Sequence, residues 1–243
     1  MEHITQNIPE LMAETESKEE SSFQQIIPVL MKRGIHNVNL SMFDENKKRE
    51  LLNAVGEEYL KKGSVIEAIK VFTVTKNRDR LIQVGDDHAK VGLFNHAIDA
   101  YRLAGARDKL QRIGERCLEE GHLPESIKAF KECNDTVRLQ KVGEYCVDKG
   151  KIDFALEVFY ATGNREQLMH VGDLCVAKNQ YAYAFKAYEM ANDKEKLNYI
   201  ADIFLKTGLL GSALQAYQKA DNQMMIDFIQ QNFSEKNFSR VYV

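Results

Sequence analysis

The feature that most restricts how this chain can fold is a repeat of 29 residues that begins at Leu52 and stays in phase to the end. Six full copies and a shorter seventh need no insertion or deletion, and they span residues 52–80, 81–109, 110–138, 139–167, 168–196, 197–225 and 226–243. A repeat of this length is one supersecondary unit that buries its apolar face only by stacking on its neighbours. We therefore expect a linear array of similar units.

Apolar and small residues recur at helical spacing in two groups per repeat, at positions 1, 4, 5 and 8 and at positions 14, 17, 18 and 21. Each repeat is therefore expected to hold two amphipathic helices. Position 5 is Gly in five repeats and Ala201 in the sixth, which indicates a close approach of two helices. Position 21 is always aromatic and is expected to fill the space beside that residue: Phe72, Tyr101, Phe130, Phe159, Tyr188 and Tyr217.

The helix ends are also marked in the repeat. Position 12 is Gly in five repeats and Asn179 in the fifth, and these residues favour the left-handed conformation that ends a helix. Position 26 carries an N-capping side chain in five of six repeats: Asn77, Asp135, Asn164, Asp193 and Asn222. The sequence thus predicts an all-α, right-handed α-solenoid of six helix-turn-helix repeats plus a truncated seventh, over residues 46–243.

The order of these residues resembles the tetratricopeptide repeat over residues 52–225: Val-Gly, Tyr or Cys three positions on, then Ala, then Phe or Tyr four positions later. Two departures are the length of 29 instead of 34 residues and the absence of that family's Trp and closing Pro, which imply a shorter second helix. Short units of this kind look like those of coat and intraflagellar-transport proteins. The resemblance implies a non-enzymatic scaffold or adaptor for complex assembly, whose first helices line a partner-binding groove.

The two ends do not continue the full repeat. Residues 1–45 are expected to form an acidic arm with a cap near 22–33, where the apolar run Phe23–Met31 can cover the first repeat. At the other end, the apolar residues of the shortened seventh repeat have no evident cover. They either cap the stack with a frayed tail or make a homodimer or partner contact, for which the candidates are Phe233, Phe238, Val241 and Tyr242.

Composition and motifs exclude several classes of function. No run of about 18 apolar residues predicts a membrane span, and the first residues lack the pattern of a secretory signal, which favours a cytoplasmic protein. Phosphate-loop, hydrolase and zinc-protease motifs are absent, so we expect no catalytic residues, no cofactor and no metal. Cys117, Cys146 and Cys175 share position 8, where packing is favoured over a metal ladder, and His88 is interpreted as a packing residue at that position.

Position 6 is acidic in every full repeat: Glu57, Asp86, Glu115, Glu144, Asp173 and Asp202. Ordinary surface pairs with a Lys four residues later account for three of them, namely Glu57–Lys61, Asp86–Lys90 and Asp202–Lys206. The other interpretation is a binding site for a basic or helical segment of another protein. Its members are Glu115, Glu119, Glu144 and Asp148, where like charges follow at the same spacing, with Gln111 and Gln140 beside them.

Nucleic acid is the alternative partner. The formal net charge is −3, so the chain as a whole does not present the basic stripe expected of a phosphate-binding surface. A local basic cluster near the first repeat supports an accessory factor that docks on a ribonucleoprotein such as the ribosome. Its residues are Lys47, Lys48, Arg49, Lys61 and Lys62.

Overall fold

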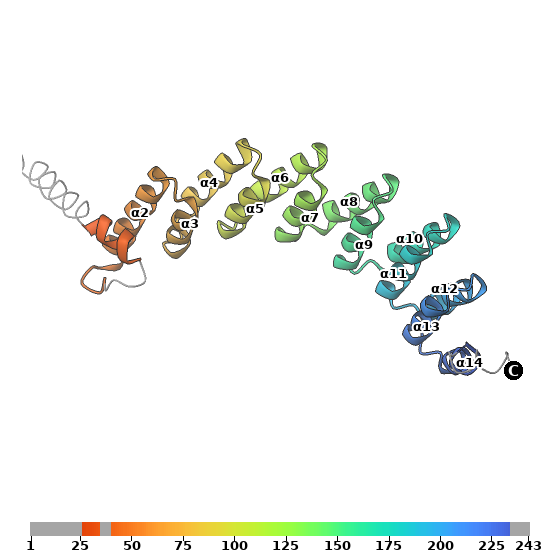
Figure 1. Cartoon of the computed structure of the whole chain (residues 1–243). Coiled ribbons are helices and arrows are strands. Elements are labelled where there is room, and N and C mark those ends of the chain that lie inside the picture. The colour runs from red at the N-terminus through yellow and green to blue at the C-terminus, as the bar shows by residue number, and fades with distance from the viewer. Residues whose placement is uncertain (1–25, 35–39, 234–243) are drawn as a thin grey trace, which may run out of the picture. The chain divides into compact units, whose positions relative to one another are not determined.

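The computed structural model describes residues 26–34 and 40–233, and all regular secondary structure in these ranges is helical (Figure 1). Residues 26–33 are helical, and the first helices of the repeats follow: α2 (Glu45–Lys61), α4 (Arg78–Lys90), α6 (Arg107–Glu119), α8 (Thr136–Asp148), α10 (Arg165–Ala177), α12 (Lys194–Lys206) and α14 (Gln223–Phe233). The second helices are α3 (Val65–Val74), α5 (Phe94–Leu103), α7 (Leu123–Glu132), α9 (Ile152–Ala161), α11 (Tyr181–Ala191) and α13 (Leu210–Lys219). The all-α solenoid of consecutive helix pairs is confirmed.

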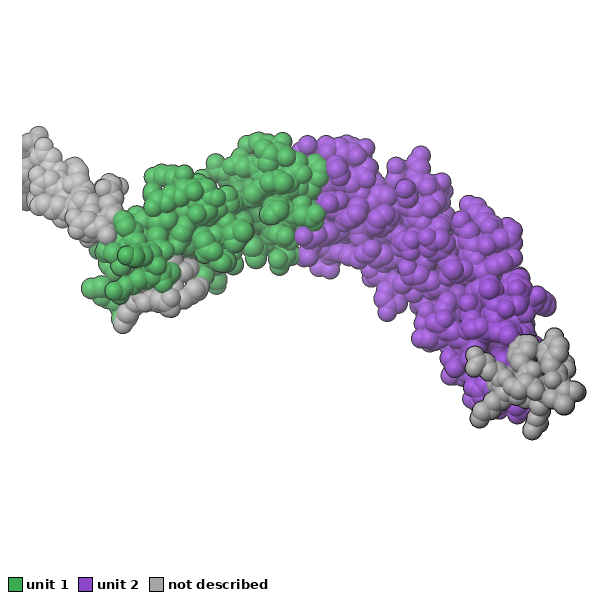
Figure 2. Space-filling model, viewed as in Figure 1, with its two compact units in different colours: residues 1–115 green, residues 116–243 purple. Residues whose placement is uncertain are grey.

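Two compact units divide the chain, residues 1–115 and residues 116–243 (Figure 2). In the first unit α2 packs on α3, α3 on α4, and α4 on α5. In the second unit each helix from α7 to α14 packs on the next, and α9 also contacts α7 and α11. The first helices α2, α4, α8, α10 and α12 thus pack on their own second helices, and the second helix α9 stacks on α7 and α11, which is the packing that a helix-pair repeat requires.

The helix ends agree with the sequence pattern and add a second left-handed residue. Every residue at position 12 has a positive φ, from 57° at Asn179 to 84° at Gly121. The predicted N-caps accept backbone bonds, as when Asn77 Oδ1 accepts from Arg80 N at 3.2 Å. Position 25, which the sequence analysis missed, also has a positive φ in every full repeat: Lys76, Gly105, Asn134, Gly163, Asn192 and Asp221.

Close approach at position 5 is confirmed by the space around the glycines. A Cβ built on Gly85 would lie 2.5 Å from Cε1 of Tyr101, and one built on Gly143 would lie 2.7 Å from Cε1 of Phe159. Real Cβ atoms do not approach a neighbour so closely, so the aromatic ring at position 21 occupies the space that a side chain at position 5 would need. These rings are at most 3% exposed.

The residues that precede the first repeat contribute to its core. Leu30 from the helix at 26–33 and Leu40 are buried with Leu51, Leu52 and Val55. The hydroxyl of Tyr59 donates to the carbonyl oxygen of Met31 at 3.3 Å. Apolar surface at this end of α2 and α3 is therefore covered by the chain itself, whereas the acidic residues at 10–20 lie outside the described ranges.

Candidate partner-binding surface

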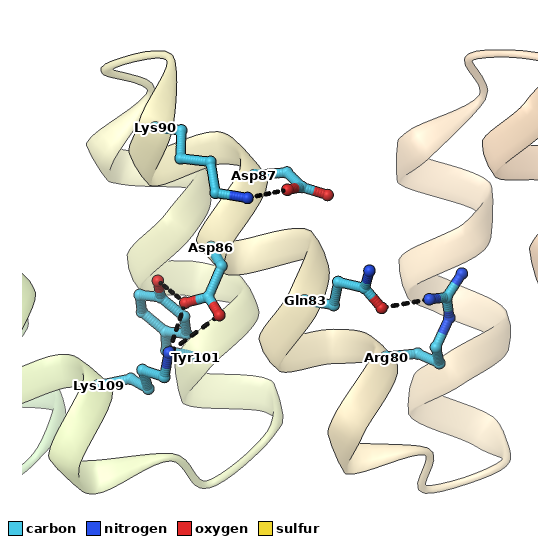
Figure 3. Close-up of polar contacts among 7 residues, drawn as sticks. All are labelled: Arg80, Gln83, Asp86, Asp87, Lys90, Tyr101 and Lys109. Carbon is cyan, nitrogen blue, oxygen red and sulfur yellow. Dashed lines mark hydrogen bonds and ion pairs between the residues drawn. The ribbon is translucent and has the colours of Figure 1, made fainter.

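The acidic residue at position 6 bonds to the aromatic residue of its own repeat wherever that residue is Tyr. The ring of Tyr101 lies against Gly85. Its hydroxyl donates to Asp86 Oδ1 at 2.8 Å (Figure 3). The same bond joins Tyr188 to Asp173 at 2.6 Å and Tyr217 to Asp202 at 2.5 Å. A buried phenol needs such an acceptor, and the acid on the neighbouring helix supplies it.

A basic residue from the next first helix completes this arrangement. Lys109 Nζ donates to both carboxylate oxygens of Asp86 at 2.7 and 2.9 Å (Figure 3). Lys196 donates to Asp173 at 2.7 Å in the same way. The acid is thus shared between two helices of its own repeat and the first helix of the following one, so it links neighbouring repeats.

The type of acid follows the type of ring. Asp occurs in the three repeats with Tyr at position 21, and Glu occurs in the three with Phe. In the first repeat Glu57 has no hydroxyl to accept from, and it pairs with Arg80 of the next first helix. The shorter acid thus accompanies the ring that carries a donor, and the longer acid accompanies the ring that lacks one. This correlation is visible in the sequence and the sequence analysis missed it.

Two of the surface pairs expected at a spacing of four residues, Glu57–Lys61 and Asp86–Lys90, do not form. Lys61 pairs with Glu58 and Lys90 pairs with Asp87, each three residues back. The position-6 acid of both repeats instead bonds to a basic residue 23 residues later. Packing turns that acid toward the neighbouring helices, because the glycine before it has brought the second helix close.

The hydrogen bonds set the ionisation of these acids. Burial by itself raises the pKa of Asp86, but the bonds from Lys109 and Tyr101 outweigh it and leave the pKa below its ordinary value. The pKa of Asp173 is lowered by the same balance, with Lys196 and Tyr188 as donors. The two tyrosines that donate to position-6 acids in the second unit, Tyr188 and Tyr217, have raised pKa values, first from burial and then from the bonded acid. These acids are therefore anions near neutral pH and are already engaged within the protein.

The acidic candidates for partner binding lie on two first helices. Glu115 and Glu119 are exposed on α6, and Glu144 and Asp148 are exposed on α8. Among the described residues, Glu119, Glu144 and Asp148 form no hydrogen bond or ion pair, while Glu115 has a partner. These three acids differ in this respect from Asp173 and Asp202 of the same unit.

The neutral candidates Gln111 and Gln140 are half-buried at position 2. Equivalent residues in other repeats bond to the position-26 residue that precedes the next first helix: Asn53 Oδ1 accepts from the Asn77 side chain at 3.1 Å, and Asn198 Oδ1 accepts from Asn222 at 2.6 Å. Position 2 therefore contributes to the joint between repeats, and the part of it that remains accessible lies beside position 6.

The basic candidates are spread along α2 rather than gathered in one patch. Lys47, Lys48 and Arg49 lie in its first turns and Lys61 at its end, about 20 Å away along the helix axis. Lys48 pairs with Glu45 at 3.4 Å, and Lys61 pairs with Glu58 at the same distance. Lys62 follows the helix and contacts the sulfur of Met31 at 3.7 Å.

At the last helix, Phe233 is 40% exposed and packs edge-on against Phe228, with ring centres 6.2 Å apart. Buried residues occupy its position in complete repeats, such as Cys175 and Phe204. The other candidates for a dimer contact, Phe238, Val241 and Tyr242, lie outside the described residues.

A hollow in the first unit was not expected from the sequence. Its volume is about 470 Å³, and apolar residues of α2, α3, α4 and the turn after α4 form most of its wall: Leu60, Val65, Val84, Val91 and Leu93. Arg80, Gln83, Asp87 and His88 complete it, with Arg80 bonded to Gln83 and Asp87 to Lys90 (Figure 3). Because its charged residues already have partners, this hollow is suited to an apolar side chain.

The three cysteines and the one histidine at position 8 lie in packed surroundings. Cys117, Cys146 and Cys175 are buried, and burial raises the pKa of Cys117 to about 12 and of Cys146 to about 11, so both stay as neutral thiols. Burial lowers the pKa of His88, which stacks on His96 at 5.4 Å. Within the described ranges no group of three metal-ligating side chains occurs, and none of their helices is long and apolar enough to cross a membrane.

Comparison with known proteins adds no relative: no protein-family model matches the chain, and no curated protein matches it. The functional proposal therefore rests on the residues described above.

Proposed function

We propose that this chain is a non-enzymatic, tetratricopeptide-like scaffold of the cytoplasm that binds a basic segment of a partner protein on its first helices. The observation that supports the proposal is the pair Glu144 and Asp148 on α8, two exposed acids without a partner among the described residues. They stand four residues apart, where like charges reduce helix stability. A basic partner would remove that repulsion on binding.

The contrast with the neighbouring repeats strengthens the proposal. Asp173 and Asp202 occupy the same position as Glu144, and each accepts a tyrosine hydroxyl. Glu144 stands opposite Phe159, which has no donor, and the next first helix, α10, has Gln167 at the position that Lys109 and Lys196 occupy elsewhere. The internal bonds that engage the other acids are thus missing from this repeat, and its acid is left to interact with other molecules.

An exposed aromatic residue follows Glu144 on the same helix. Tyr145 is 38% exposed, and the ammonium group of Lys149 lies 5.6 Å from the centre of its ring. A tyrosine provides apolar contact area at low entropic cost, and its ring already accommodates a cation. Acids for charge and a ring for contact are the combination that recognises a segment rich in Lys or Arg.

The test compares two sets of charge reversals in the full chain. The first set replaces Glu115, Glu119, Glu144 and Asp148 with Lys. The control set replaces four acids of the second helices with Lys, which changes the net charge equally: Glu67, Glu132, Glu157 and Glu189. Nuclease-treated lysate is crosslinked to each protein, and the linked lysines are mapped by mass spectrometry.

We expect partner crosslinks at Lys141, Lys149 and Lys151 that survive nuclease, disappear in the first set and persist in the control set. Retention of every crosslink in the first set would refute the acidic site. Crosslinks at Lys47, Lys61 and Lys62 that are lost with nuclease would instead support the ribonucleoprotein factor and refute the scaffold as proposed.

A further inference from the structure

A second hollow, of about 550 Å³, opens between the last two full helix pairs of the second unit. Aromatic residues line it: Tyr181, Tyr183 and Phe185 from α11 and Phe204 from α12. None of its lining side chains is charged. In this respect it differs from the hollow of the first unit, whose wall includes Arg80, Asp87 and His88.

This hollow forms because some residues of the last full repeat differ in size from the residues at the same positions in the preceding repeats. Phe204 stands at position 8, where the three preceding repeats have Cys. Its ring packs edge-on against Tyr181 and Phe185, with ring centres 6.4 Å apart in both pairs. On the facing helix α13 the small residue Ser212 lines the hollow, with Gln215 beside it. Large rings on one side and the short Ser212 side chain on the other leave the space open.

Two of the rings are held in position by their hydroxyl groups. Tyr181 donates to Asn179 Oδ1 at 2.7 Å, and Asn179 is fixed in the left-handed turn before α11. Tyr183 donates to Asp153 Oδ2 at 3.1 Å, and Lys186 holds that carboxylate at 2.9 Å. Rings that are already oriented cost little entropy when a ligand packs on them.

Free hydrogen-bonding groups surround the rings. The side chains of Gln180, Ser212 and Gln215 line the hollow and make no hydrogen bond to other described residues. Amide and hydroxyl donors of this kind can bond to backbone carbonyls that are not already paired. A polyproline II segment leaves its carbonyls unpaired and packs its proline rings on aromatic surfaces, whereas a helix uses its carbonyls internally.

We propose that this hollow binds an extended, uncharged, proline-containing segment of a partner protein. The rings of Tyr181, Phe185 and Phe204 contact the proline rings, and the amides of Gln180 and Gln215 donate to the carbonyls of the segment. The hollow lies on other helices than the acids of α6 and α8, so it adds a second binding specificity that does not depend on the acidic site.

The test titrates the full chain into a fluorescently labelled polyproline peptide of about ten residues, a length that forms a polyproline II helix. Ser212→Leu fills the hollow from its small-residue side, and we expect it to weaken binding by about tenfold or more, as for loss of a central contact. Gln218→Leu, on the exposed side of α13, adds the same apolar group outside the hollow and should leave affinity unchanged.

A second variant keeps the test decisive if Ser212→Leu alters the fold. The double substitution of Gln180 and Gln215 to Ala removes only exposed donors, and it should weaken binding about threefold to tenfold, the worth of one or two hydrogen bonds. Circular dichroism melts check that each variant is folded. Equal affinity for a Gly-Ser peptide of the same length, tighter binding of an amphipathic helical peptide, or polyproline binding unchanged by these substitutions would each overturn the proposal.

Discussion

The repeats at 52–80 and 81–109 are neighbours in the first unit, and they combine the aromatic ring at position 21 with the acid at position 6 in different ways. In both, an aromatic ring covers the glycine at position 5, through Phe72 on Gly56 and Tyr101 on Gly85. The ring with a hydroxyl meets Asp86, and the ring without one stands in a repeat whose acid is Glu57. Only the second of these repeats ties its acid to its own second helix.

The difference shows that the acid at position 6 is primarily a structural residue. In the repeat with Tyr101 it links three helices, and in the repeat with Phe72 it links two first helices through Arg80. An acidic residue that recurs at the same position of every repeat therefore need not form a binding surface. It is a candidate for binding only where the internal partners are missing, as at Glu144.

The largest effect is expected at the shared feature of both repeats, the glycine under the ring. Gly85→Leu should lower the free energy of unfolding by about 3 kcal/mol, because its side chain overlaps the Tyr101 ring and forces the helix pair apart. Urea unfolding followed by circular dichroism measures the loss. Gly211→Leu is the control, since open space surrounds that glycine. Equal stability of the two variants would contradict the packing described here.

A smaller effect is expected from the hydroxyl that distinguishes the two repeats. Tyr101→Phe should cost about 1.5 kcal/mol, because Asp86 loses a charged hydrogen bond in a half-buried place. Adding Asp86→Glu recreates the Glu–Phe pair of the first repeat and should restore part of this loss. The double-mutant cycle is measured by urea unfolding, with Tyr160→Phe as an exposed control. Simple additivity would show that acid and ring are not coupled.

The smallest effect concerns the turn after the second helix. Lys76 has a φ of 53°, whereas the next repeat places Gly105 there with a φ of 62°. Lys76→Gly should raise the free energy of unfolding by about 0.5 to 1 kcal/mol, since relief of the left-handed strain exceeds the entropic cost of glycine. Gly105→Lys should lower it by a similar amount. Urea unfolding measures both changes. A shift of the urea midpoint in the opposite direction for either variant would contradict the strain assigned to Lys76.

Much of the fold could be predicted because its determinants are local and repeated. The periodicity of positions 1 to 21, the left-handed residue at position 12 and the caps at position 26 each depend on a few neighbouring residues. Six copies in phase make such weak signals reliable. The left-handed residue at position 25 was missed because Lys76 and Asp221 hide a pattern that Gly105, Asn134, Gly163 and Asn192 suggest.

The sequence by itself determined which helix faces are apolar, where the first helix of each repeat ends, and that the array is built of helix pairs. Only the tertiary structure decided the partner of each acid, because Asp86 and Lys109 are 23 residues apart and meet only when neighbouring repeats pack. The same holds for the aromatic hollow, whose rings and small residues come from three helices. Local spacing fixes which face of a helix is apolar, whereas contacts between helices depend on how closely the small residues let them approach.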